Sequence, residues 1–429
     1  MTKGKSSPSS GTAPALKTKG RGPKRTIQKK VVVVSKEALR AQLERVNALA
    51  SDWLTRLGRH KAPKKRKVIH TASDCSGHGS DLIAYRLLGL QSQVQPVIMS
   101  EASREKVLLH QAVAQECGWN YDGHEVIDMF LRKQDSMTTA DVYVAGYPCP
   151  SYSKLGKHQG VFDQRGLLTL KGLEYVALCR PKVLVLEQVK AILEKKHSQI
   201  WNYILKILNQ LEYVVDHQVL STQDFAIPQS RPRVYILAVA KEICKGTLKL
   251  PEKRSEKVDL HHFIDKDKTG SEVLRLPKYE GLLGSKMWRK GYILDVGSSE
   301  KFQAVMTNCA PCLTHTRLGQ GGYYIPKLRR RLLLEEAAAL QGVPKKVVRA
   351  MQRAAEEHKL PARIVDASLG DAMSINVLAS VLMKGLTHAR LVQFSAQDDH
   401  WRLVANGPDA ATLSDRLFDG TARPGPGSK

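Results

Sequence analysis

The chain has 429 residues, 42% of them hydrophobic and 25% charged, which excludes a wholly disordered protein and suffices for a catalytic domain with a smaller lobe. Its 67 Lys and Arg against 41 Asp and Glu give a net charge of +26, so we expect a polyanionic partner such as nucleic acid. No apolar run approaches the roughly 20 residues of a membrane span, so no membrane partner is expected. Seven scattered cysteines, an odd number, argue against a disulfide framework and fit a reducing compartment.

The first 67 residues carry most of the positive charge, with 19 Lys and Arg against three acids. Their polar, Gly- and Pro-containing start predicts a disordered basic arm over residues 1–34. In the segment 35–67, apolar side chains every three or four residues after Ser35 predict an amphipathic helix ending near Gly58. Residues 63–68 (Pro-Lys-Lys-Arg-Lys-Val) resemble a well-known nuclear-localisation signal, which favours an import receptor and a nuclear location. The alternative is a solvated basic linker that contacts phosphates.

From residue 68 the pattern alternates between strands and helices. It predicts strands over 68–72, 94–99, 141–145, 181–186 and 233–239, and helices over 81–88, 103–116 and 200–211. Such alternation is typical of an α/β fold with a doubly wound, Rossmann-like parallel sheet. Ligands of these sheets bind at the carboxyl ends of the strands.

A glycine turn and an acid stand at the ends of the first two predicted strands. Gly77 and Gly79 supply the turn, Glu101 closes the second strand, and Asp128 follows further on. This arrangement binds adenosine-type cofactors, whose ribose hydroxyls donate hydrogen bonds to the acid. An ordinary turn and a helix N-cap are the structural alternatives.

Cys149 lies between Pro148 and Pro150, directly after a buried strand. A cysteine held by fixed φ angles at an expected ligand edge favours a nucleophile over an inert structural thiol. Glu187 ends the next buried strand, and neighbouring strand ends converge on one cleft, so the two side chains can meet there. The alternative for Glu187 is a helix N-cap.

The order and the amino-acid sequences of eight segments over about residues 68–385 resemble those of the cytosine-C5 methyltransferase family. They are Gly77-x-Gly79, Glu101, Asp128, Pro148-Cys149, Glu187-Gln-Val, Gln229-Ser-Arg231-Pro-Arg233, Arg330 through Pro344, and Gly370-Asp-Ala-Met373. The resemblance implies a catalytic and cofactor-binding domain over 68–240, which the chain re-enters over 328–390. It also implies a smaller, irregular target-recognition domain over 241–327, and we expect a C-terminal tail over 391–429.

The resemblance implies methyl transfer from S-adenosylmethionine to C5 of a flipped cytosine. Cys149 would add to C6, and Glu187 would relieve charge at N3. Arg231 and Arg233 would bind the base O2 or flanking phosphates. The cofactor would be bound by Gly77, Gly79, Glu101, Asp128 and Pro148. We expect nucleic-acid contacts from Ser151, Gln229, Arg329, Arg330 and Arg331.

Four residues depart from the family pattern: Gln188 and Asp371 replace common asparagines, Ser80 replaces a glycine, and Cys75 replaces an aromatic residue.

The recognition segment is basic and holds aromatic residues suited to base contacts or to a local core. These are Trp288, Tyr292, Phe302, Tyr323 and Tyr324. Cys309, Cys312, His261 and His262 lack a complete set of zinc-ligand spacings, so no metal is expected.

The sequence therefore favours a nuclear methyltransferase acting on double-stranded DNA. The same chemistry on RNA, particularly tRNA, is the second hypothesis, and a catalytically weak nucleic-acid-binding regulator is the third. Neither the target motif, the oligomeric state nor the choice between maintenance and de novo action follows from the residues.

Overall fold

The computed structural model describes residues 35–56, 68–120, 128–130, 132, 137–148, 167–274, 293–298 and 306–422. The chain divides into two compact units, residues 1–32 and 33–429, of which only the second is described. The predicted basic arm, most of the import-like patch, Cys149 and Ser151 lie outside the described residues, as do Trp288, Tyr292 and Phe302.

A six-stranded sheet forms the centre of the second unit, in the order β2-β1-β3-β4-β6-β5. The strands are β1 (Ile69–Asp74), β2 (Val94–Ser100), β3 (Val142–Gly146), β4 (Val183–Val189), β5 (Tyr213–Ser221) and β6 (Pro232–Ala240). Strands β2, β1, β3 and β4 are parallel, as predicted. Strand β6 is antiparallel to both of its neighbours, so the sheet is mixed rather than wholly parallel.

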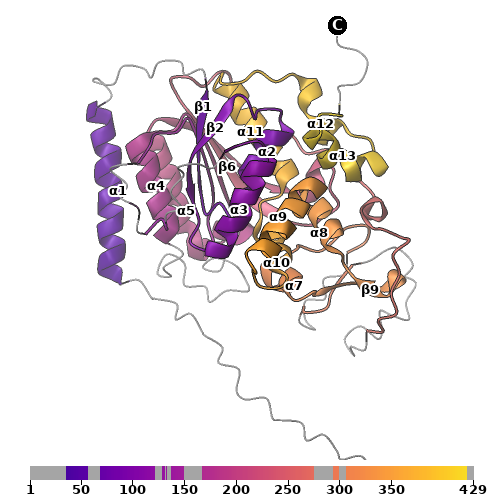
Figure 1. Cartoon of the computed structure of the whole chain (residues 1–429). Helices are drawn as coiled ribbons and strands as arrows, with labels where there is room; N and C mark the ends of the chain where they lie inside the picture. Colours follow the sequence, from indigo (N-terminus) through magenta and orange to yellow (C-terminus); the bar gives the residue numbers. More distant parts are fainter. Residues whose placement is uncertain are drawn as a thin grey trace, which may run out of the picture. The chain divides into compact units, whose positions relative to one another are not determined.

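Helices cover both faces of this sheet, which confirms the doubly wound prediction (Figure 1). On one face lie α1 (Lys36–Arg56), α4 (Leu167–Cys179) and α5 (Ser198–Gln210). On the other lie α2 (Ser80–Leu87), α3 (Arg104–Glu116) and α11 (Ile375–His388). Along β3, Val142 and Val144 belong to one hydrophobic cluster and Tyr143 and Ala145 to the other, because successive side chains point to opposite faces.

The predicted N-terminal helix is part of this core. Ser35 accepts a hydrogen bond from the Ala38 amide at 3.1 Å, which caps α1. Val46 and Ala50 are completely buried in the cluster that contains α4 and α5. The helix therefore packs on the catalytic domain.

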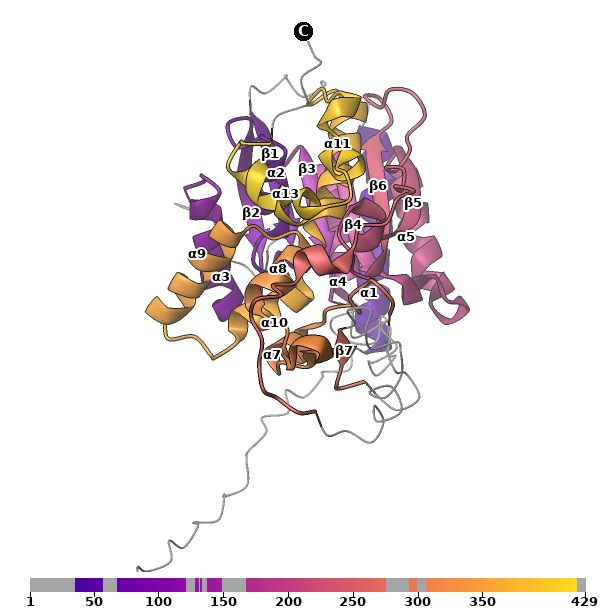
Figure 2. The ribbon, with the colours of Figure 1, turned by 90° about the vertical axis from the view of Figure 1, so that its right-hand side faces the viewer.

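The recognition segment contributes a small antiparallel sheet of β7 (Leu294–Asp295), β8 (Tyr323–Ile325) and β9 (Arg330–Arg331), with α7 (His315–Gly319) beside it. The chain returns through α8 (Leu334–Gln341), α9 (Lys345–Glu357) and α10 (Ile364–Asp371) before α11. Figure 2 shows α7, α8 and α10 next to one another. Short 3₁₀ turns complete the described chain: Lys190–Leu193, Lys195–His197, Thr222–Phe225, Leu260–Phe263, Pro326–Leu328 and Ala396–Asp398.

The C-terminal region differs from the expected tail. Residues His400–Leu403 form α12 and Pro408–Phe418 form α13. Leu413 and Phe418 are buried, and Arg86 of α2 donates to the Phe418 carbonyl at 3.2 Å. Apolar residues spaced along 408–418 therefore dock a helix that the glycine- and proline-containing composition obscured. In the part of the chain described, no single helix is long and apolar enough to cross a membrane. The bent pair α10 and α11, which meet at an angle of 43°, would together be long and apolar enough by length and composition alone.

Candidate functional site

The glycine turn and Glu101 meet at the carboxyl ends of β1 and β2. The Gly77 amide donates to the Glu101 carboxylate at 3.0 Å, and the Ser103 amide donates to its other oxygen at 2.9 Å. Gly77 has φ +59° and Gly79 φ +91°, conformations that favour glycine. A Cβ atom at Gly77 would meet no atom within 4 Å, so open space lies beside the turn. The backbone is thus accessible to a ligand held by Glu101.

The segment that carries Asp128 is tied to the end of β1 by a buried ion pair. Arg132 donates to both oxygens of Asp74, at 2.5 and 2.9 Å, and Tyr143 donates to the same carboxylate at 2.6 Å. The Arg132 amide in turn donates to the Asp128 carbonyl. These bonds hold Asp128 close to the strand end occupied by Cys75, whose sulfur lies 3.9 Å from that of Met129. The structure therefore brings four of the five predicted cofactor residues, Gly77, Gly79, Glu101 and Asp128, to one edge of the sheet.

Asp371, one of the departures, has charged partners that an asparagine would not need. Its carboxylate binds Lys106 Nζ at 2.7 Å and His315 Nδ1 at 2.7 Å. Although burial acts in the opposite direction, these two partners lower the pKa of Asp371 to about 2. Lys106 comes from α3 and His315 from α7, so Asp371 joins the cofactor edge to the recognition segment. Of the other departures, Ser80 begins α2, and Cys75 adopts a positive φ of 53°.

The candidate catalytic carboxylate is buried where β4 and β6 pair. Arg233 Nε lies 3.0 Å from Glu187 Oε1. Burial raises the pKa of Glu187, and the Arg233 and Arg231 guanidinium groups only partly oppose that rise. Glu187 is also the register partner of Gly146, the last residue of β3 and two residues before Pro148. Its carboxylate therefore adjoins the chain that leads into the Pro-Cys segment.

Gln188, which also replaces an asparagine common in the family, reaches the same stretch of chain before Pro148. Its Nε2 donates to the Tyr147 carbonyl over 3.5 Å, a long bond, while its Oε1 accepts from the Val189 amide at 2.9 Å. The longer side chain thus contacts the residue before Pro148. Cys149 itself lies outside the described residues, so its predicted meeting with Glu187 stays a prediction.

Arg231 and Gln229 have structural partners instead of an open face toward a ligand. Arg231 is buried and donates to the carbonyls of Leu313 (2.5 Å), Gly370 (3.2 Å) and Ala372 (2.7 Å). The completely buried Gln229 donates to the Leu340 carbonyl at 2.6 Å and accepts from the Leu313 amide at 3.1 Å. Gln229 therefore does not have the predicted access to nucleic acid, and Arg231 binds backbone carbonyls in place of a base or phosphate.

The three consecutive arginines that follow the recognition segment also differ in surroundings. Arg329 is exposed, as the prediction requires. Arg330 is buried and binds Glu336 at 2.7 and 2.9 Å, which contradicts its predicted contact with nucleic acid. Arg331 is partly exposed and binds Glu272. Tyr323 and Tyr324 are buried, with their hydroxyls donating to the Cys312 and Glu272 carbonyls, so they belong to the local core.

Cys312 is a site residue that the sequence reasoning missed. Its sulfur lies 3.6 Å from Arg231 Nη1 and 3.9 Å from Arg233 Nη2. Burial would raise its pKa, but the two guanidinium groups lower it overall. The Cys312 thiol therefore lies beside the Glu187–Arg233 pair. The Cys312-Leu-Thr sequence directly before α7 was the feature that could have indicated it.

One group with metal-ligand chemistry occurs among the described residues. Ligand atoms of Asp259, His261 and His262 lie within 4.8 Å of one another. Asn308 already donates to the Asp259 carboxylate at 2.5 Å. Cys309 is hydrogen-bonded to Gln223 instead and takes no part in this group.

Comparison with known proteins identifies the family of the chain. Residues 118–382 match the family model described as C-5 cytosine-specific DNA methylase. The Type II methyltransferase M.HgiBI of Herpetosiphon aurantiacus is 28% identical over 172 residues, which cover 39% of each chain. M.Bsp6I of Bacillus sp. (strain RFL6) is 27% identical over 248 residues, covering 52% of this chain and 75% of that one. The matched region thus spans only about two fifths of the first relative.

A solved structure supports the fold. The Entamoeba histolytica methyltransferase EhMeth has a TM-score of 0.50 and 14% identity, and the alignment covers 76% of this chain and 100% of that one. The matched family model covers more than half of the present chain and includes β3, β4, β6 and the Pro-Cys segment. The chain belongs to the C-5 cytosine-specific DNA methylase family, whose members use S-adenosylmethionine as methyl donor.

Proposed function

We propose that this protein is a DNA cytosine-5 methyltransferase that modifies a flipped cytosine through a covalent adduct with Cys149. The observation that carries the proposal is the buried Glu187–Arg233 pair, which adjoins Gly146 at the start of the Pro-Cys segment. A duplex covers the faces of its bases, so the target must leave the stack to reach a buried carboxylate.

The residues divide the chemistry between nucleophile and acid. Cytosine C5 is a weak nucleophile, and addition of the Cys149 thiolate to C6 makes it enamine-like. That addition places negative charge toward N3. Glu187 retains a proton to higher pH than an ordinary carboxyl, because burial raises its pKa, and it can donate that proton to N3. Arg233 orients the carboxyl from 3.0 Å.

The cofactor edge fits S-adenosylmethionine, which supplies an electrophilic methyl group when bound. Open space beside Gly77 lets the backbone approach the amino-acid part, and Glu101 offers carboxylate oxygens to the ribose hydroxyls. Asp128 is held at the same edge and would accept from the adenine amino group. After methylation, the C5 proton leaves to a base and Cys149 is expelled, which regenerates the thiolate.

Methyl incorporation tests this proposal directly. Cys149→Ala should abolish transfer of tritiated methyl to duplex DNA, whereas Cys244→Ala, a half-buried cysteine outside the site, should retain it. Unmethylated duplex, hemimethylated duplex and tRNA are compared in parallel. Methyl transfer by Cys149→Ala would contradict the mechanism. Methylation of tRNA but not of duplex DNA would favour the RNA hypothesis over the DNA hypothesis. DNA binding without calorimetric binding of S-adenosylmethionine supports the regulator hypothesis.

We also propose nuclear import through residues 63–68, on the strength of their four consecutive cations. A fluorescent fusion of the full chain should accumulate in nuclei. Replacing Lys64 and Lys65 by alanine should redistribute it. An unchanged distribution would leave residues 63–68 as a phosphate-contacting linker.

A further inference from the structure

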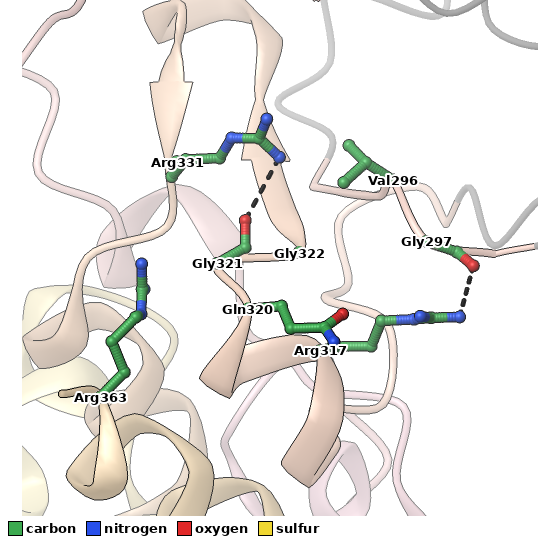
Figure 3. Close-up of a pocket in the computed structure, with 8 residues that line it drawn as sticks. All are labelled: Val296, Gly297, Arg317, Gln320, Gly321, Gly322, Arg331 and Arg363. Carbon is green, nitrogen blue, oxygen red and sulfur yellow. Dashed lines mark hydrogen bonds between the residues drawn. The ribbon is translucent and has the colours of Figure 1, made fainter. Parts of the chain in front are cut away.

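A pocket of about 400 Å³ lies between the recognition segment and the chain that follows it, outside the candidate catalytic site (Figure 3). It is bounded by α7, the start of α10 and the small sheet. Among the described residues, its lining contains three guanidinium groups, from Arg317, Arg331 and Arg363, but no carboxylate and no aromatic ring. This lining suits an anion better than a base, which needs a flat apolar or aromatic surface.

Each guanidinium group is held by an acid that does not line the pocket. Arg317 Nε lies 3.0 Å from Asp295, and Arg363 Nη2 lies 3.1 Å from Asp366. Both arginine side chains are more exposed, at 26% and 44%, than their acids, at 17% and 15%. The acids therefore hold these guanidinium groups in place, and Arg317 Nη2 also donates to the Gly297 carbonyl (Figure 3). Preorganised donors of this kind lose less conformational entropy on binding an anion.

Arg331 completes the set through a contact with the glycine loop. Its guanidinium binds Glu272 and donates to the Gly321 carbonyl at 3.2 Å. Figure 3 shows Arg331 and Arg363 on either side of the chain at Gly321. Arg329, two residues before Arg331, adds an exposed cation on the β8–β9 turn.

Glycines make the room that the pocket requires. A Cβ atom at Gly321, where φ is +64°, would lie 2.8 Å from Arg363 Nη1. At Gly297 it would overlap the Arg317 guanidinium. At Gly322 it would lie 3.0 Å from the Arg317 carbonyl oxygen. Side chains here would displace the cations, so the glycine loop and the arginines form one built site.

The pocket is also close to the catalytic pair along the chain. Cys312 contacts Arg233, and α7 begins three residues later and ends at Gly319, next to the pocket lining. The pocket therefore follows the catalytic pair through one short helix, α7.

We propose that this pocket binds a backbone phosphodiester of the duplex DNA substrate. The assignment rests on the proposed function for the identity of the polymer. Phosphate contacts fix the register of a protein on DNA without reading sequence. The pocket would thus hold the duplex while the cytosine enters the catalytic site.

The test measures binding of a labelled mixed-sequence duplex by fluorescence anisotropy at several salt concentrations, using the full chain. Replacing both Arg317 and Arg363 by glutamine should raise Kd about tenfold and reduce the slope of log K against log salt by about one. The matched control is Arg402→Gln, because Arg402 is 47% exposed and paired with Glu252 at 2.8 Å. It lies on α12, well apart from α7 in Figure 1.

Three outcomes overturn the proposal. In the first, the double variant has the same Kd and the same salt slope as Arg402→Gln. In the second, it binds duplex DNA more weakly but its salt slope is unchanged. In the third, measured with tRNA in parallel, it binds tRNA more weakly and duplex DNA as tightly as wild type. If the double variant melts earlier than wild type, Arg363→Gln alone decides, since its side chain is the more exposed. A wild-type protein that binds duplex but transfers no methyl group would refute the proposed function, and the anisotropy experiment would still test the pocket.

Discussion

Asp81 is a carboxyl group buried in the first turn of α2, directly after the glycine turn. Desolvation raises its pKa from 3.8 to about 6, despite hydrogen bonds from backbone amides and Ser73. The folded state therefore favours the protonated form. The resulting stability is present below the unfolded-state pKa and is lost as pH rises through the folded-state pKa. At neutral pH, ionisation of Asp81 should cost the folded state about 3 kcal/mol.

Replacing Asp81 by asparagine removes this titration. An asparagine N–H without an acceptor would cost about 1 to 3 kcal/mol, but equally at every pH. The quantity to measure is therefore the difference in free energy of unfolding between Asp81→Asn and wild type, and how that difference changes with pH. Between about pH 5 and about pH 7.5, the two pKa values predict that Asp81→Asn gains about 1.4 kcal/mol relative to wild type.

Urea denaturation followed by tryptophan fluorescence at the two pH values measures this difference. The control is Asp409→Asn, because Asp409 also lies in the first turn of a helix but is 73% exposed. A stability difference that stays constant for Asp81→Asn would refute the reasoning. So would an equal pH effect in Asp409→Asn, since that carboxyl is not desolvated.

Three further predictions follow from the described contacts. Glu187→Gln should lower methyl transfer at least about a hundredfold, and the wild-type rate should fall as pH rises through the raised Glu187 pKa, a dependence that the variant lacks in a tritium assay. Gln229→Ala should destabilise the protein by about 3 kcal/mol in urea denaturation, because it leaves the buried Leu313 amide and Leu340 carbonyl without this partner. Deleting residues 1–34 should weaken salt-sensitive DNA binding and leave the melting temperature unchanged, whereas deleting residues 1–67 should also lower that temperature, since Val46 and Ala50 are core residues.

The sequence predicted that Gly77 and Glu101 lie together, because strand ends in an open α/β sheet converge. Gly77 and Glu101 are separated by a helix in the chain, yet the rule for parallel strands placed them together, and a hydrogen bond joins them. The antiparallel direction of β6 was not predictable from its own residues. A buried strand shows the same apolar run in either direction, and only its pairing with β4 and β5 decides.

The roles within Gln229-Ser-Arg231-Pro-Arg233 could not be separated from sequence either. Alternate residues of an extended chain share a face, so the motif alone predicts one common environment for the three side chains. Their partners come from segments 80 to 140 residues away, around Leu313 and Ala372. These segments cover Gln229 and Arg231 and leave Arg233 beside Glu187. Distance in sequence hid which arginine binds backbone carbonyls and which lies beside Glu187.

Those same distant partners explain how the recognition segment is positioned on the catalytic sheet. Gln229 and Arg231 bind the amide and carbonyl of Leu313, while Asp371 binds His315 two residues later. The chain entering α7 is therefore fixed from three sides, and α7 leads directly to the arginine pocket. Because packed elements move as rigid bodies, the distance from that pocket to Glu187 is set by these bonds. Weakening any of them should change methyl transfer by misplacing the DNA, even though none of these residues needs to touch it.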